Sequence, residues 1–131
     1  MRKDFSSSWI ASSQPRKQRK YRYEASLHVR HKFLSAHLSK ELRAKYKKRS
    51  LPVRVGDEVL VMRGTFAKKK GKIAKVYLKK SKVTVEGITR KKIDGSKLNV
   101  YLDPSKLQII SLMAEDKRRL NLGESNAQHK K

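Results

Sequence analysis

Residues 55–87 read VGDEVLVMRGTFAKKKGKIAKVYLKKSKVTVEG, and they carry the clearest indication of the fold class. Apolar residues alternate with others over 58–62, and a second apolar run follows over 73–78, so both segments are predicted strands. Gly64 would supply a positive φ where the first strand ends, and Gly71 would let the second restart sharply. The stretch therefore predicts a strand, a tight basic loop that projects Phe66 and three lysines, and a returning strand.

The chain on either side of this hairpin continues the pattern of short strands. A third strand is expected over 82–86, and Ile93-Asp94-Gly95-Ser96 is a turn signal between two further short segments. Asp103-Pro104-Ser105 starts another turn, and 107–112 is a last apolar strand. A spacing of about ten residues between short strands is typical of a small, mainly β barrel.

The N-terminal third differs in composition. Residues 14–23 are basic and show neither helical nor strand periodicity, which predicts an extended arm that orders only on a polyanion. A short helix is expected from Ser39 to about Tyr46, with Ser39 as N-cap and Glu41 in the first turn. We therefore expect four parts, and the barrel should fold without the arm. They are a flexible lead with Trp9 (1–13), a basic arm with a short helix (14–50), the barrel (51–112) and a C-terminal extension with a short helix over 114–122 (113–131).

The charge points to a polyanionic partner. The chain of 131 residues carries 35 Lys and Arg against 11 Asp and Glu, a formal net charge of +24. The arm holds 13 basic and two acidic residues, and the barrel holds 15 and five. No run of about 18 apolar residues exists and no secretory signal is expected, which disfavours a membrane. There are no cysteines, so disulfides and thiolate metal sites are excluded.

The histidines of the arm suggest a metal site only weakly. His28 and His31 are three residues apart and His37 is nearby, a spacing that two zinc ligands can have. Arg30 and Lys32 flank them, and a basic arm repels a cation. We therefore interpret these histidines as RNA contacts and expect no metal or other cofactor.

Carboxylates raise the alternative of an enzyme that acts on RNA. Asp57 with Glu58, and Asp94 with Asp103, are the available pairs. Asp57 and Asp94 occupy turn positions, where the side chain bonds to local backbone, and Glu58 fits a surface strand position. No phosphate-binding loop ending in Lys-Ser/Thr is present. We expect no catalytic residues and no small-molecule substrate.

Aromatic residues interleave with basic ones in the arm. Tyr21 and Tyr23 alternate with Arg19, Lys20 and Arg22. Tyrosines stack on exposed bases while basic residues neutralise phosphates. Packing of a tyrosine back on the barrel is the alternative.

Several blocks in order carry a family resemblance. Residues 55–87 resemble a KOW motif, an RNA-binding element built on a small SH3-like barrel. Further blocks resemble the universal KOW-domain protein of the large ribosomal subunit, number twenty-four in bacterial and twenty-six in eukaryotic naming, in its archaeal and eukaryotic branch and closest to the archaeal side. These blocks are 15–20, 27–32, 37–43, 46–54, 85–87, 92–97 and 104–107, and the resemblance covers about 14–122. The family often has Lys-Gly where this chain has Ala67-Lys68.

The resemblance implies a structural constituent of the large subunit. It implies binding to the first domain of the large-subunit RNA near the exit of the peptide tunnel, contacts with neighbouring ribosomal proteins, a role in early assembly, a place on cytoplasmic ribosomes and no homo-oligomer. The alternative is a KOW module of a transcription elongation factor that binds polymerase and nascent RNA. The RNA-binding residues predicted from charge, aromatic character and motif are Arg16, Lys17, Arg19, Lys20, Tyr21, Arg22, His28, Arg30, His31, Lys32, Lys47, Lys48, Arg49, Arg54, Arg63, Phe66, Lys68, Lys69, Lys70 and Lys72.

Overall fold

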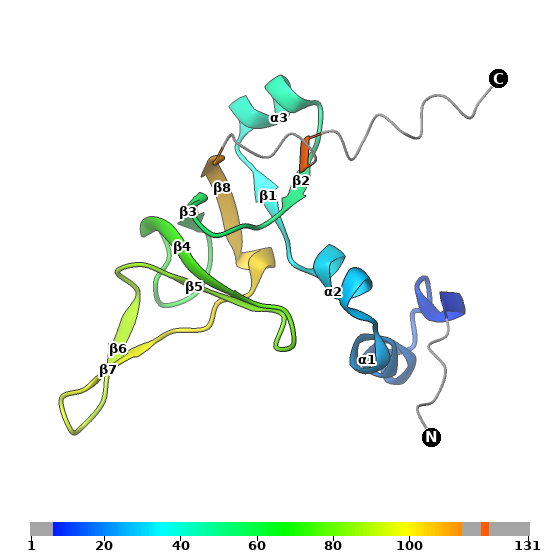
Figure 1. The fold of residues 1–131 in the computed structure, drawn as a ribbon, viewed down its shortest axis with the longest axis horizontal. Helices are drawn as coiled ribbons and strands as arrows, with labels where there is room; N and C mark the ends of the chain where they lie inside the picture. Colours follow the sequence, from blue (N-terminus) through cyan, green and yellow to red (C-terminus); the bar gives the residue numbers. More distant parts are fainter. Residues whose placement is uncertain (1–6, 114–118, 121–131) are drawn as a thin grey trace.

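The computed structural model describes residues 7–113 and 119–120 (Figure 1). Six strands form one sheet in the order β2-β1-β8-β3-β4-β5, and two more form a separate ribbon, β6-β7. This mainly β arrangement confirms the small barrel-like domain predicted from sequence. The strands are β1 (Ser35–Leu38), β2 (Ser50–Pro52), β3 (Glu58–Val61), β4 (Lys70–Tyr77), β5 (Lys82–Val85), β6 (Thr89–Lys91), β7 (Lys97–Asn99) and β8 (Leu107–Ser111).

Pairing in the sheet is antiparallel with one exception. β1 runs parallel to β8, with His37 opposite Gln108 and Leu38 opposite Ile109. β8 in turn pairs antiparallel with β3, and β4 joins β3 to β5. The β1–β8 pair therefore brings an N-terminal segment and the last strand of the described chain together.

The core follows from the alternation of apolar residues along the strands. Val59 and Val61 on β3 are buried, as are Val83 and Val85 on β5, which confirms the predicted phase of both strands. The remaining members of the cluster lie on other strands of the sheet and in the segments that flank them: Leu34, Ala36, Leu38, Leu51, Val53, Ile73, Ile88, Leu102, Leu107 and Ile109.

One strand begins earlier than its apolar residues indicate. The prediction starts the second strand of the hairpin at Ile73, whereas β4 begins at Lys70. Lys70 lies opposite Leu60, and Lys72 lies opposite Glu58. Backbone pairing with β3 thus extends the strand through lysines whose side chains remain exposed.

The prediction that residues 14–23 lack regular structure is wrong. They form α1 (Pro15–Glu24), which begins at Pro15, and α2 (Leu27–Phe33) follows. Proline is favoured in the first turn of a helix, since its missing N–H would be unpaired there. The end of the lead also has structure, because Trp9 completes a 3₁₀ turn, η1 (Ser7–Trp9). The amide of Gln18 donates to the carbonyls of Trp9 at 2.8 Å and Ser12 at 2.7 Å, which holds the lead on α1.

The second half of the expected arm belongs to the sheet. β1 pairs with both β2 and β8, and Leu34, Ala36 and Leu38 are buried in the core. The expected boundary at residue 50 therefore does not coincide with the packing. In Figure 1, η1, α1 and α2 reach away from the strands, so the projecting part of the chain ends near residue 33.

The predicted helix after β1 is present. α3 (Lys40–Tyr46) follows Ser39, whose hydroxyl accepts a hydrogen bond from the backbone N–H of Leu42 at 3.3 Å. Glu41 lies in the first turn and Lys45 in the last, as the helix dipole favours. The helix ends at Tyr46 and is followed by Lys47, which adopts a left-handed φ of 51°.

Candidate nucleic-acid interface

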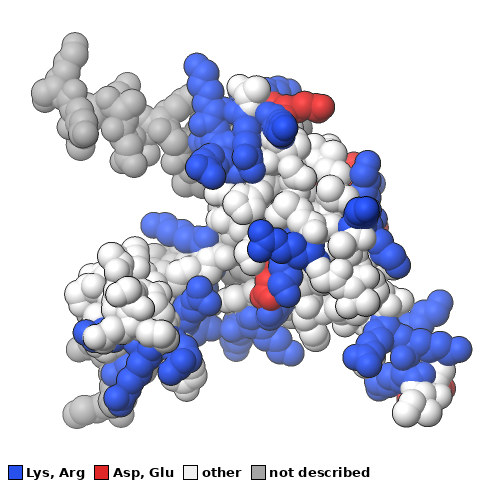
Figure 2. Space-filling model, turned by 180° about the vertical axis from the view of Figure 1, so that it is seen from behind, with Lys and Arg blue, Asp and Glu red and all other residues white. Residues whose placement is uncertain are grey.

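The predicted RNA-binding residues lie on parts of the molecule that surround the core. They occupy the helical arm, the segment after α3, and the β3–β4 hairpin, and most of their side chains are exposed. Figure 2 shows lysines and arginines gathered on separate projecting parts, with few acidic side chains between them on that face. Such an arrangement suits several RNA segments that approach from different sides.

The two tyrosines of α1 have different surroundings. Tyr21 is only 5% exposed, and its ring meets the ring of Phe33 edge-on at a centroid distance of 5.8 Å. Tyr23 is 82% exposed. Tyr21 therefore packs against Phe33 inside the arm, a contact that neither interpretation named, and Tyr23 presents the ring that is free to stack on a base.

Arg30 links the arm helices to the barrel. Its guanidinium donates to the carbonyls of Ala25 at 2.9 Å and Tyr23 at 2.6 Å, just past and within the last turn of α1. It also donates to the carbonyl of Lys79, in the loop between β4 and β5, at 3.2 Å. These bonds give Arg30 a structural task beside the RNA contact predicted for it.

Backbone hydrogen bonds hold the loop of the β3–β4 hairpin, which carries several lysines. Lys68 donates its backbone N–H to Val61 at 2.7 Å, and Ala67 donates to Gly64 at 3.0 Å. Phe66 is half-buried and packs against the core, with the ammonium of Lys69 5.3 Å from its ring centroid. The ring of Phe66 is thus partly shielded from solvent, and Lys68, Lys69 and Lys70 form the accessible surface of the loop.

The glycines that frame this loop act in two ways. Gly64 has a φ of +98°, as predicted. Gly71 instead permits close approach, because a Cβ there would lie 2.7 Å from the carbonyl oxygen of Glu86 and 2.8 Å from Cγ1 of Val85. Lys68 adopts a φ of +68°, so this chain has a lysine in a conformation that favours glycine.

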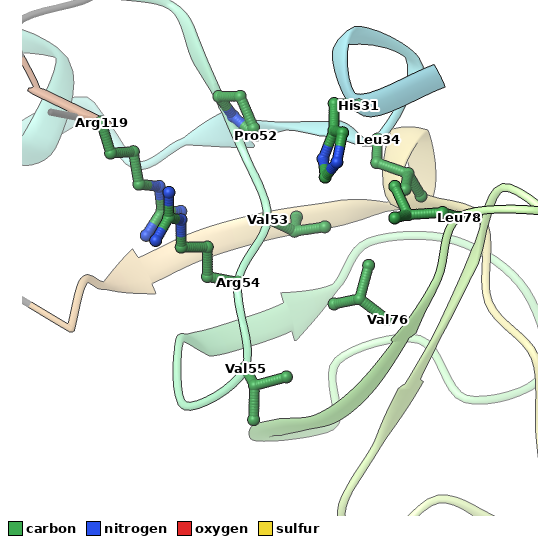
Figure 3. Close-up of a pocket in the computed structure, with 9 residues that line it drawn as sticks. All are labelled: His31, Leu34, Pro52, Val53, Arg54, Val55, Val76, Leu78 and Arg119. Carbon is green, nitrogen blue, oxygen red and sulfur yellow. The ribbon is translucent and has the colours of Figure 1, made fainter. Parts of the chain in front are cut away.

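A cavity of about 810 Å³ lies between α2, the segment before β3, and β4 (Figure 3). Its apolar lining includes Leu34, Val53 and Val76, and the ring of His31 points into it. Arg54 also lines it. The cavity thus brings two of the predicted residues, His31 and Arg54, to one apolar site.

Sequence reasoning missed the role of Asp57. The side chain is fully buried, and its two oxygens accept from the guanidinium of Arg119 at 2.8 and 2.6 Å. The backbone N–H groups of Arg54 and Met113 donate to it at 2.9 and 3.3 Å. The Arg54 bond is the local turn contact that was predicted. The long-range partner leaves no local signal, because the two residues are 62 positions apart.

The other carboxylates also serve the fold. Asp94 accepts from the hydroxyl of Ser96 at 2.6 Å and from its backbone N–H at 2.9 Å, which confirms its predicted turn role. These hydrogen bonds, the hydroxyl one first, lower the pKa of Asp94. Asp103 forms ion pairs with Lys82 and, at 3.9 Å, with Lys106. Asp94 and Asp103 therefore each have partners that support a turn or an ion pair of the fold.

The described ranges lack the features of two other kinds of site. No group of three or more His, Cys, Asp or Glu residues with metal-binding geometry occurs in 7–113 and 119–120. No helix in that part of the chain is long and apolar enough to span a membrane.

Comparison with known proteins gives consistent matches. A family model that describes the ribosomal proteins named L26 in eukaryotes and L24 in archaea matches residues 12–124. A protein of Methanospirillum hungatei named "Large ribosomal subunit protein uL24" is 47% identical over 110 residues, which is 84% of this chain and 92% of that protein. A protein of the same name from Korarchaeum cryptofilum is 44% identical over 115 residues, 88% of each chain.

Proposed function

Because the chain belongs to the ribosomal protein family named L26 in eukaryotes and L24 in archaea, we propose that it binds the RNA of the large ribosomal subunit through its arm and barrel. Membership makes it a structural, non-enzymatic constituent of the large subunit, on cytoplasmic ribosomes. The alternative of a transcription-factor module is not favoured. The relatives that match are named as ribosomal proteins, and the match covers most of the length of each.

The observation that carries the proposal is the position of the charge. The arm presents Arg16, Arg19 and Arg22 on a helix that projects from the sheet. The β3–β4 hairpin presents Lys68, Lys69 and other basic residues on its loop and first strand positions. Basic side chains on parts that reach away from a closed core can neutralise phosphates of RNA helices that would otherwise repel each other.

The finer proposal concerns place and timing. By family resemblance, the site lies in the first domain of the large-subunit RNA, near the exit of the peptide tunnel. The protein acts there as a monomer beside other ribosomal proteins, and binds early in subunit assembly. The 20 residues named above supply the contacts, with Tyr23 in place of Tyr21 as the stacking ring.

A salt titration tests the RNA proposal. The full-length protein is bound to a transcript of the first domain of an archaeal large-subunit RNA at several salt concentrations. The double variant Arg16→Gln/Arg22→Gln should make the slope of log K against log salt shallower by about 1.4–1.8, which is about 0.7–0.9 for each lost phosphate contact.

The matched control removes the same charge elsewhere. Lys40→Gln/Lys45→Gln changes two exposed lysines of α3, which are not among the predicted residues. Its slope should stay closer to that of the unmodified protein. Equal affinity for the transcript and for an unrelated RNA of the same length would contradict the proposed function.

A further inference from the structure

The β6–β7 ribbon is built without a core of its own. All six residues of its strands are exposed, and in Figure 1 the ribbon projects from the barrel on the side away from the arm. Its turn is well bonded, since Lys92 donates to Ser96 at 2.9 Å and Gly95 donates to Lys92 at 3.1 Å. An isolated two-stranded ribbon is marginally stable at best, so a partner that covers it would add stability.

The register divides the side chains of the ribbon between two faces. Lys91 lies directly opposite Lys97, and Thr89 lies opposite Asn99. Residues opposite each other, and those two positions along, share a face. Lys91, Lys97, Thr89 and Asn99 therefore form one polar face, which we call the lysine face. Arg90 and Leu98, also opposite each other, lie on the reverse face.

The lysine face places two like charges side by side. Cβ atoms of directly opposed residues are about 4.5–5.5 Å apart, and like charges at that spacing destabilise a hairpin. Neither ammonium forms an ion pair with any residue of the described ranges. The nearby carboxylate of Asp94 accepts from Ser96 instead. The face is thus electrostatically unfavourable by itself and complementary to a polyanion.

We propose that the lysine face of the β6–β7 ribbon is a further RNA-binding element, in which Lys91 and Lys97 bind backbone phosphates and Thr89 and Asn99 donate to phosphate or ribose oxygens. This rests on the proposed function, and adds residues that were not among the predicted contacts. Between them, a hydroxyl, an amide and two ammonium groups offer hydrogen-bond donors to phosphate oxygens and no fixed negative charge.

The positive charge of the ribbon favours RNA over a protein as the partner that binds the lysine face. The ribbon and its turn, residues 89–99, contain Arg90, Lys91, Lys92 and Lys97 against Asp94 alone. Interfaces between proteins are depleted of lysine at their centre, whereas contacts with nucleic acid depend on it. The exposed side chain of Ile93 at the tip is the feature that a protein partner would use, and the test includes it.

The test compares the two faces in the full-length protein. Lys91→Gln/Lys97→Gln removes the repulsive pair and should fold at least as well as the unmodified protein. With the first-domain transcript as probe, the slope of log K against log salt should become shallower by about 1.4–1.8. Arg90→Gln/Lys92→Gln also removes two positive charges, one from the reverse face and one just past the end of β6. It should change the slope by less than half as much.

The outcomes separate this inference from the proposed function. Equal effects of the two double variants would show a general charge effect and overturn the lysine face. An unchanged slope for Lys91→Gln/Lys97→Gln, with specific binding by the unmodified protein, would overturn the inference and leave the proposed function standing. Ile93→Ser should leave RNA affinity unchanged. If Ile93→Ser, and not the lysine variant, prevented incorporation into large subunits, the ribbon would bind a protein instead.

Direct placement provides a second readout. The chain has no cysteine, so Ile93→Cys creates a single attachment point for a tethered iron chelate at the ribbon tip. Hydroxyl radicals should then cleave the bound transcript at a discrete set of nucleotides. Absence of cleavage in a complex that forms with unchanged affinity would contradict the inference.

Discussion

Arg119 donates to both carboxylate oxygens of Asp57 in a site where the two side chains are 3% and 0% exposed. Asp57 precedes β3, and its remaining hydrogen bonds come from the backbone N–H groups of Arg54, before β3, and Met113, after β8. A two-point guanidinium–carboxylate contact fixes orientation as well as distance. The pair therefore attaches a residue beyond the last strand to the first turn of the barrel hairpin.

Removal of the arginine should destabilise the barrel strongly. Arg119→Met leaves the carboxylate of Asp57 buried without its partner, and we expect the free energy of unfolding to fall by about 3–5 kcal/mol. Denaturant titration measures this. Asp57→Asn combined with Arg119→Met should cost less than the sum of the two single changes, since they remove one interaction. Additive losses would show that the two residues act independently.

Truncations should locate the boundary of the independently folded unit. The sequence predicted that the barrel folds without residues 14–50. The structure leads to the opposite expectation, because this deletion removes β1 and three side chains of the hydrophobic core, Leu34, Ala36 and Leu38. A chain that begins at residue 34 should retain the circular dichroism of a β-sheet and unfold cooperatively. A chain that begins at residue 51 should not. A cooperative transition in the shorter chain would disprove this assignment.

Replacement of Lys68 by glycine should stabilise the hairpin loop. A left-handed φ costs a residue with a Cβ about 1–2 kcal/mol, and glycine loses about 0.5–1 kcal/mol more chain entropy on folding. Lys68→Gly should therefore raise the free energy of unfolding by up to about 1.5 kcal/mol. Lys68→Ala, which removes the charge and keeps the strain, is the matched control and should show no such gain.

The N-cap of α3 offers a small and well-defined test. Ser39→Ala removes the acceptor for the N–H of Leu42 and should cost about 1 kcal/mol in denaturant titration. Ser39→Asp supplies another acceptor and should recover most of that loss. If both variants lose the same stability, the hydroxyl of Ser39 contributes through something other than capping.

The turn of the β6–β7 ribbon should respond to acid. The hydroxyl and backbone N–H of Ser96 hold the pKa of Asp94 below its ordinary value of 3.8. A lowered folded-state pKa means that the carboxylate stabilises the turn above pH 3.8 and that this contribution is lost as pH falls through the folded-state value. NMR titration of the Asp94 carboxyl measures the pKa directly. Ser96→Ala should shift it upward, part of the way to 3.8, because the backbone donor remains. An unchanged pKa would contradict this cause.

Prediction from sequence succeeded where the signal was local. Alternation at Val59 and Val61, the glycine conformation at Gly64, and the caps and turns at Ser39 and Asp94 all depend on neighbours a few residues away. The small-barrel class was also predicted correctly, because it follows from the regular spacing of short strands and turns along the sequence. The 20 predicted contact residues remain a prediction. The structure leaves most of them exposed and removes Tyr21 from the surface.

The failures involve residues that depend on partners outside their own helix or strand. The helix over 15–24 carries little apolar surface, and its turns are supported by Tyr21 against Phe33 and by Arg30 at its end. The position of β1 depends on β8, and that of Asp57 on Arg119, so neither partner can be identified from the composition around it. Charge counts alone also did not distinguish the two faces of the β6–β7 ribbon, which only the register defines.

The parallel pairing of β1 with β8 has a consequence during synthesis. β1 ends at Leu38 and β8 begins at Leu107, so a growing chain presents its basic helices and the β8-facing edge of β1 long before the strand that completes the sheet has been translated. Folding of the barrel must therefore wait until β8 has emerged. In that interval the arm is available to polyanions and the edge of β1 to chaperones, so the order of translation favours capture of the nascent protein by its N-terminal part.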